Sequence, residues 1–172
     1  MHADSSASEG SQTEPVSTGD EPPEPFHLQT PAGFFPADQK WLFDHLHQLL
    51  EHLPRAVEQV NIRLLDDSGI SKLHQQWKGI DGPTDVLSWF HSSSDQPIEV
   101  DLAIGFDVAA REAAQRGHSV RQELLLYIVH GILHGCGFDD LAPEAADRMH
   151  AEEDRILALL GTKATYRHGD SE

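Results

Sequence analysis

Hydrophobic and polar residues alternate along this chain with two different periods. Apolar residues recur every three or four positions over 37–53 and again after Pro143, and this spacing predicts an amphipathic helix in each segment. Apolar and polar residues alternate one by one over 57–65, which predicts a strand. The same reasoning predicts four further elements: a short helix from the turn at 66–69 to Trp77, strands over 85–90 and 98–106, and a helix over 107–117.

The segment from Ser119 to Asp140 differs from the rest because its helix is apolar on nearly every side. Ser119 and Gln122 have the spacing of a capping box, so we expect the helix to begin there. Gly135 and Gly137 can adopt the left-handed backbone that ends a helix. A helix without a polar face belongs in the protein interior, and we expect this one to be the central element of the fold.

Two histidines stand four residues apart within this apolar helix. At that spacing His130 and His134 share one face, with their imidazoles about 6 Å apart along the axis. The glycines that follow let the chain fold back, so that Asp139 or Asp140 can supply a carboxylate as third ligand. Each histidine could instead be a hydrogen-bonded core residue, but this compact set of donors favours a site for a metal such as zinc.

The residues around the histidines narrow the kind of metal site. Zinc peptidases with the H-E-x-x-H motif carry a glutamate base directly after the first histidine, whereas this chain has Gly131 there. We therefore do not expect a peptidase of that type. The third donor stays open, because His150 or Glu153 could also approach the metal if the last helix packs against the site.

Together these elements predict an α+β fold, in which a small mixed β-sheet is covered by helices and the metal-bearing helix is central. We expect a single domain over 33–165, a length usual for one domain. Residues 1–32 are predicted to be a disordered acidic tail, because the first 25 contain six acids, many Ser, Gly and Pro, and no Lys or Arg. Residues 166–172 are predicted to be a flexible C-terminus.

The balance of charges limits the possible partners. The formal net charge is -17, so the chain lacks the basic bias common in nucleic-acid binders, and any RNA contact must use a local patch. Cys136 is the only cysteine, which excludes an intrachain disulfide and favours a reducing compartment. No window approaches the ~20 apolar residues of a membrane span. We therefore expect a soluble, cytoplasmic protein without a membrane partner.

Three stretches in order carry a resemblance to a known family. They are PTDVLSWF from Pro83, DLAIGFDVAAREA from Asp101, and HGILHGCGFDD from His130. Together they resemble the YbeY family, bacterial metal-dependent endoribonucleases that act in ribosomal RNA maturation. The resemblance extends from about Val57 to Gly161. It implies a zinc-dependent hydrolase that cuts single-stranded RNA, with ribosomal RNA as substrate and ribosomal proteins or assembly factors as possible partners.

The resemblance also implies roles for individual residues. The two histidine ligands of the family fall on His130 and His134, and its third ligand, normally a histidine, falls on Asp140. The family's arginine before the P-T-D stretch is replaced by Lys78, which keeps a positive charge for a phosphate but loses the two-pronged guanidinium. The implied site is therefore one Zn²⁺ held by two histidines and an aspartate, with Lys78 as the catalytic residue. The same ligand types also serve iron(II).

Two other functions remain open at this point. The first is a metallohydrolase that acts on another substrate, such as a peptide or a small ester. The second is a non-catalytic ribosome assembly factor whose zinc is structural, in which case loss of a ligand would destroy the fold.

Overall fold

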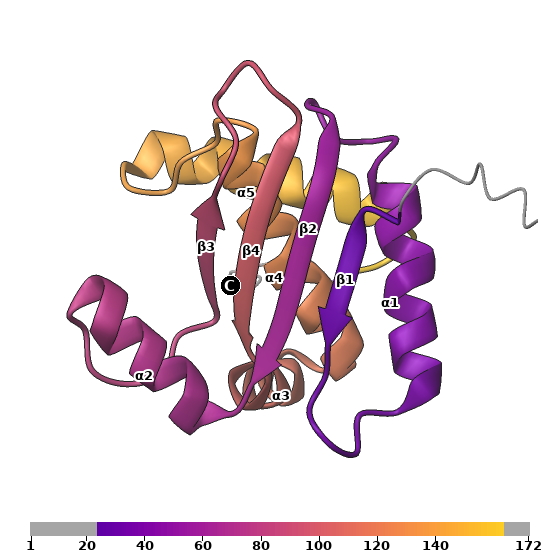
Figure 1. Cartoon of the computed structure of the whole chain (residues 1–172). Helices are drawn as coiled ribbons and strands as arrows, with labels where there is room; N and C mark the ends of the chain where they lie inside the picture. Colours follow the sequence, from indigo (N-terminus) through magenta and orange to yellow (C-terminus); the bar gives the residue numbers. More distant parts are fainter. Residues whose placement is uncertain (1–23, 164–172) are drawn as a thin grey trace, which may run out of the picture.

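The computed structural model describes residues 24–163 of the chain. Its four strands form one sheet in the order β1-β2-β4-β3 (Figure 1). β1 and β2 are parallel, β2 and β4 are parallel, and β3 runs antiparallel to β4. The predicted small mixed sheet is thus confirmed. The strands span Phe26–Gln29 (β1), Val57–Leu65 (β2), Val86–Phe90 (β3) and Ile98–Gly105 (β4).

Strand β1 corrects the predicted boundary of the acidic tail. Phe26–Gln29 lies within the predicted tail of residues 1–32, yet it pairs with β2, and Phe26 is buried in the core. Four residues are too few for a period of two to be evident beside a segment rich in Pro and Glu. Residues 1–23 and 164–172 lie outside the described residues, so the remainder of the tail and the flexible C-terminus stay predictions.

Within the described part of the chain five helices accompany the sheet, and each was expected from the sequence. They are α1 (Pro36–Leu49), α2 (Asp67–Lys78), α3 (Phe106–Arg116), α4 (Val120–Gly135) and α5 (Pro143–Leu159). Helix α1 ends before the predicted residue 53. In Figure 1, α3, α4 and α5 lie behind the sheet and α1 runs beside β1. No helix in the described part of the chain is long and apolar enough to cross a membrane.

Helix α4 is the central element, as its composition predicts. Residues 123–133 of this helix are all buried, and it contacts α1, α3, α5, β3 and β4. Its first turn has the predicted capping box, in which the Ser119 amide donates to Gln122 Oε1 over 2.9 Å. Gly131 allows the close approach to the sheet, because a Cβ there would lie 2.8 Å from Leu102 Cδ2. The main core therefore forms between α4 and one face of the sheet.

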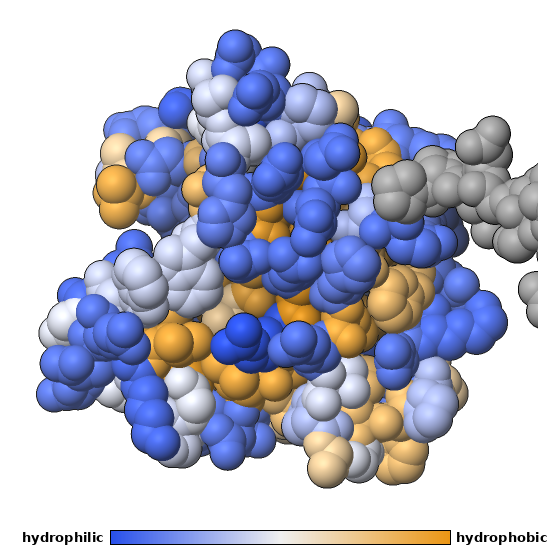
Figure 2. Space-filling model, in the orientation of Figure 1, coloured by the Kyte–Doolittle hydropathy of each residue, from blue (hydrophilic) through white to orange (hydrophobic). Residues whose placement is uncertain are grey.

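The opposite face of the sheet is only partly covered. Helix α2 packs over its β3 side through a small second core of Ile70, Leu87 and Ala103. The part of this face toward β1 carries polar side chains and remains open to solvent (Figure 2). The fold thus has one closed face with the histidine helix and one open face.

Arg55 fastens the end of α4 to the hairpin of β3 and β4. Its guanidinium donates to the Gly135 carbonyl over 2.7 Å and, through Nε, to the Gln96 carbonyl over 2.8 Å. It also donates to the Ser93 carbonyl. Gly135 directly follows His134, so this contact fixes the helix end that carries the candidate metal donors.

Candidate metal centre

The histidines of α4 and the turn after it bring three potential ligands together. The Nε2 atoms of His130 and His134 lie 3.2 Å apart, and Asp140 Oδ2 lies 3.6 Å from His130 Nε2. One donor atom from each of the three residues falls within 4.8 Å of the others. Two imidazole nitrogens and a carboxylate oxygen at this separation suit a divalent ion such as zinc or iron(II).

The second nitrogen of each imidazole is held by another group. His130 Nδ1 lies 2.6 Å from Glu153 Oε1, and His134 Nδ1 donates to the Phe138 carbonyl over 3.1 Å. Acceptors at Nδ1 fix the tautomer that leaves the Nε2 lone pair available. Both rings are therefore oriented with their free nitrogens toward Asp140.

Glu153 is one of the two residues of the last helix that the sequence left open as further donors near the metal. The structure shows it fully buried and in contact with a histidine of α4. Its carboxylate contacts His130 and also lies 2.9 Å from His150 Nδ1. Glu153 thus contacts both His130 and His150. The helical period indicates the buried position of Glu153, because Glu153 follows the buried Met149 by four positions.

Two features of the environment of His130 have opposite effects on its pKa. Burial by itself lowers the pKa of the imidazole, whereas the hydrogen bond and negative charge of Glu153 raise it. Glu153 prevails, so the pKa of His130 lies above its ordinary value. A buried carboxylate paired with a ring of this kind makes the imidazole a more basic ligand.

The two aspartates after Gly137 have different positions. Asp139 Oδ1 accepts hydrogen bonds from the backbone amides of Asp140 and Leu141, so Asp139 stabilises the turn. Asp140 instead directs its carboxylate toward His130, with 39% of its side chain exposed. Gly137 has a φ of 92°, a left-handed conformation that favours glycine and turns the chain back toward α4.

Lys78 and the three donors line the same pocket, whose volume is about 650 Å³. Lys78 reaches it from the last turn of α2, Asp85 from the position just before β3, and Ser88 from β3 itself. Sequence reasoning gave Asp85 and Ser88 no role, although both lie in the P-T-D-V-L-S stretch. The pocket thus combines a cation, several carboxylates and the imidazole pair.

The fold and these donors define a class of protein: an α+β domain with a histidine and carboxylate cluster, suited to a divalent ion, at the wall of an open pocket. The family described as Endoribonuclease YbeY matches residues 36–161. The chain belongs to this family, as its motifs predicted.

Individual relatives agree with this assignment. "Endoribonuclease YbeY" of Roseiflexus sp. (strain RS-1) is 37% identical over 113 residues, which cover 60% of this chain and 71% of that protein. The protein of the same name from Moorella thermoacetica is 38% identical over 116 residues, covering 61% and 74%. "Endoribonuclease YBEY, chloroplastic" of Arabidopsis thaliana is 38% identical over 110 residues, but these span only 19% of that longer protein and 61% of this chain.

A solved structure shares the fold. The solution structure of TM1509 from Thermotoga maritima superposes with a TM-score of 0.55 over 86% of this chain and 99% of that one. The two sequences are 21% identical, so this likeness concerns the arrangement of helices and strands alone.

Proposed function

We propose that this chain is a zinc-dependent endoribonuclease that cuts single-stranded segments of ribosomal RNA. One observation carries the proposal: His130, His134 and Asp140 converge in a pocket that Lys78 also lines. The relatives named above are endoribonucleases, which supports the reaction type. Membership of the family supports dependence on a metal ion.

Each residue of the pocket has a distinct task in this proposal. His130, His134 and Asp140 would hold the ion, and Lys78 would bind a non-bridging oxygen of the phosphate to be cut. A bound Zn²⁺ supplies Lewis acidity toward the phosphodiester. Glu153 and the Phe138 carbonyl keep the two imidazoles in their ligating orientation. Asp140 would give the ion an anionic donor at the position where the family normally has a histidine.

The openness of the site favours a catalytic ion over a structural one. Structural zinc sites are closed by four protein ligands, whereas catalytic sites use three and leave a position for substrate or water. Three donors converge here, and the pocket beside them is open to solvent. Residues 123–133 of helix α4 are also packed into the core, so its folding does not depend on a ligand cluster alone.

A metal analysis combined with a cleavage assay tests the proposed function. We expect about one equivalent of zinc per chain and endonucleolytic cleavage of unpaired RNA that a chelator abolishes. Cleavage of peptides or small esters with structured RNA left intact would favour the other hydrolase class. Zinc bound without any hydrolysis, together with unfolding on chelation, would favour the assembly factor.

The cellular context is part of the same proposal. Ribosomal RNA would be the substrate, and ribosomal proteins or assembly factors would be partners, in the cytoplasm. The net charge of -17 makes recruitment by a protein partner more important than for a basic nuclease.

Lys78→Ala is expected to slow RNA cleavage and leave metal content unchanged, because its proposed partner is a phosphate and not the ion. The matched control is Lys72→Ala, on the same helix α2 but outside the pocket. Rates and zinc content would be measured for both variants. Equal rates for the two variants would assign Lys78 to the solvated surface.

Glu153→Gln is expected to weaken zinc affinity about 10- to 100-fold, because the neutral amide no longer supports His130 as the carboxylate does. Glu152→Gln is the matched control, since Glu152 pairs with Arg155 and does not contact the histidines. Competition with a chelator gives both affinities. Indistinguishable affinities would show that Glu153 only fills the core.

Asp140→Ala is expected to reduce zinc retention after dialysis, because one of three donors is removed. Asp139→Ala should retain most of the metal, since Asp139 binds the backbone of the turn. If Asp139→Ala loses the metal and Asp140→Ala keeps it, Asp139 and not Asp140 is the third ligand.

A further inference from the structure

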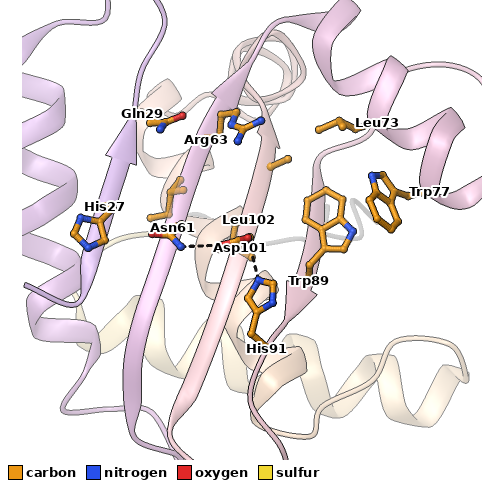
Figure 3. A pocket seen from close by; sticks show the side chains of 12 residues that line it. His27, Gln29, Asn61, Arg63, Leu73, Trp77, Trp89, His91, Asp101 and Leu102 are labelled. Atoms are coloured by element: carbon orange, nitrogen blue, oxygen red, sulfur yellow. Dashed lines mark hydrogen bonds and ion pairs between the residues drawn. The ribbon is translucent and has the colours of Figure 1, made fainter.

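The open face of the sheet carries two rows of side chains that cross all four strands. In the first row, His27 of β1, Asn61 of β2, Asp101 of β4 and Trp89 of β3 stand side by side. The second row is formed in the same way: Gln29, Arg63, Ala103 and Leu87. All of these residues except Leu87, which belongs to the small second core, line a cavity of about 490 Å³ (Figure 3). We call this cavity the sheet-face pocket.

Two tryptophans close the sheet-face pocket on its β3 side. Trp77 of α2 and Trp89 of β3 meet edge to face, with ring centroids 5.6 Å apart (Figure 3). Trp77 keeps 58% of its surface exposed, so a large part of its ring is accessible to a ligand. Exposed aromatic faces beside polar groups are the means by which proteins stack on unpaired bases.

Among the charged groups of the sheet-face pocket, the guanidinium of Arg63 is available to bind a ligand. Both oxygens of Asp101 are engaged, one by Asn61 Nδ2 at 2.7 Å and the other by His91 Nε2 at 3.0 Å. The side chain of Arg63 makes no hydrogen bond to any residue of the range 24–163, although its charge acts on the Asp101 carboxylate. Figure 3 shows it projecting over the same face. The pocket therefore offers a guanidinium for a phosphate and aromatic rings for a base.

Strand β3 and the end of α2 separate this pocket from the candidate metal centre. Trp77 lines the sheet-face pocket, and its neighbour Lys78 lines the metal pocket. Trp89 likewise faces the sheet-face pocket, whereas Ser88 and Phe90 on either side of it face the metal pocket. β3 is an edge strand, so a single extended chain can cross it from one pocket to the other.

We propose that the sheet-face pocket binds unpaired RNA beside the phosphodiester that is cut, with a base stacked on Trp77 and a phosphate bound by Arg63. This inference rests on the proposed function, which places the phosphodiester that is cut in the metal pocket. A base in a duplex is stacked on its neighbours and does not reach these rings, so the pocket selects single-stranded substrate. With one available arginine, affinity comes mainly from stacking, which suits a chain of net charge -17.

Binding of a short, labelled 2′-O-methyl RNA to the zinc-loaded full chain tests the proposal. Fluorescence anisotropy gives the affinity, and a gel verifies that the RNA stays intact. Trp77→Ala is expected to weaken binding about tenfold or more, and Trp77→Phe to restore most of it. Trp77 is the residue to replace, because Trp89 also packs against the small second core. Arg63→Gln should reduce the slope of log affinity against log salt by about 0.7.

Phe35→Ala is the matched control, since Phe35 is also an exposed aromatic residue, at 71%, but lies outside the pocket. Equal affinity of Trp77→Ala and Phe35→Ala for the RNA would overturn the proposal, even if the chain cleaves RNA. Tight binding that depends on Trp77 without any cleavage would instead refute the endoribonuclease and leave the binding site standing. Equal binding of duplex and unpaired RNA would also overturn the proposed selection.

Discussion

The double replacement of His130→Ala and His134→Ala is expected to lower zinc from about one equivalent per chain to background and to reduce RNA cleavage to that of chelator-treated protein. The reason is that two of the three converging donors are lost at once. Metal analysis and a cleavage assay measure the two effects. No other change considered for this protein should affect activity as strongly.

The fold should survive this replacement. The apolar residues of α4 that hold the core are untouched, and circular dichroism would verify this. His47→Ala on α1 is the control, because His47 is exposed and pairs with Glu24 far from the pocket. Full zinc content in a folded double variant would refute the metal centre, whereas unfolding of that variant would favour a structural ion.

Glu123→Ala is expected to lower the free energy of unfolding by about 3–5 kcal/mol, the usual cost of removing one partner of a buried ion pair. Glu123 is fully buried and accepts a hydrogen bond from Arg116 over 2.8 Å, and His118 contacts its second oxygen. Without Glu123, the guanidinium of Arg116 would remain in the interior with its main partner gone. Urea unfolding measures the change.

The surroundings of Glu123 support a large effect. Burial, and then the negative charge of Glu123, raise the pKa of Tyr127, so its hydroxyl stays protonated and can donate to the carboxylate. An exposed pair provides the comparison: Asp67→Asn breaks the contact with Arg111 at the surface and should change stability far less. Similar losses for Glu123→Ala and Asp67→Asn would show that the buried cluster contributes no more than a surface pair.

The sequence predicted the elements better than the partnerships between them. Helix α4, its capping box and the strands β2, β3 and β4 follow from local periods, which depend on near neighbours along the chain. Strand β1 was missed because it is stabilised by pairing with β2, a partner 34 positions away in the register Phe26↔Val60. Pairing at such a distance leaves little trace in a four-residue segment.

The same distinction applies to the candidate site: neighbours in the sequence were predicted better than contacts between elements. His130 and His134 stand four residues apart, so their spacing suggested a common metal ion, whereas the choice of Asp140 over Asp139 came from the resemblance. Glu153 comes from another helix, and charged residues are usually assigned to the surface unless a partner is known. The sheet-face pocket was beyond prediction, because its two rows depend on the order and register of four strands.

The position of the histidines near the end of α4 has a consequence for the charges that a ligand meets there. The last carbonyls of a helix carry partial negative charge, so this end attracts a cation and repels an anion such as phosphate. Asp139, Asp140 and Asp85 add to that field within the pocket. Under the proposed function, these charges would repel a phosphate from the metal-free pocket more than Lys78 and Arg55 attract it, so the ion would bind before the RNA. The affinity of the pocket for RNA would then depend on the supply of metal as well as on its own residues.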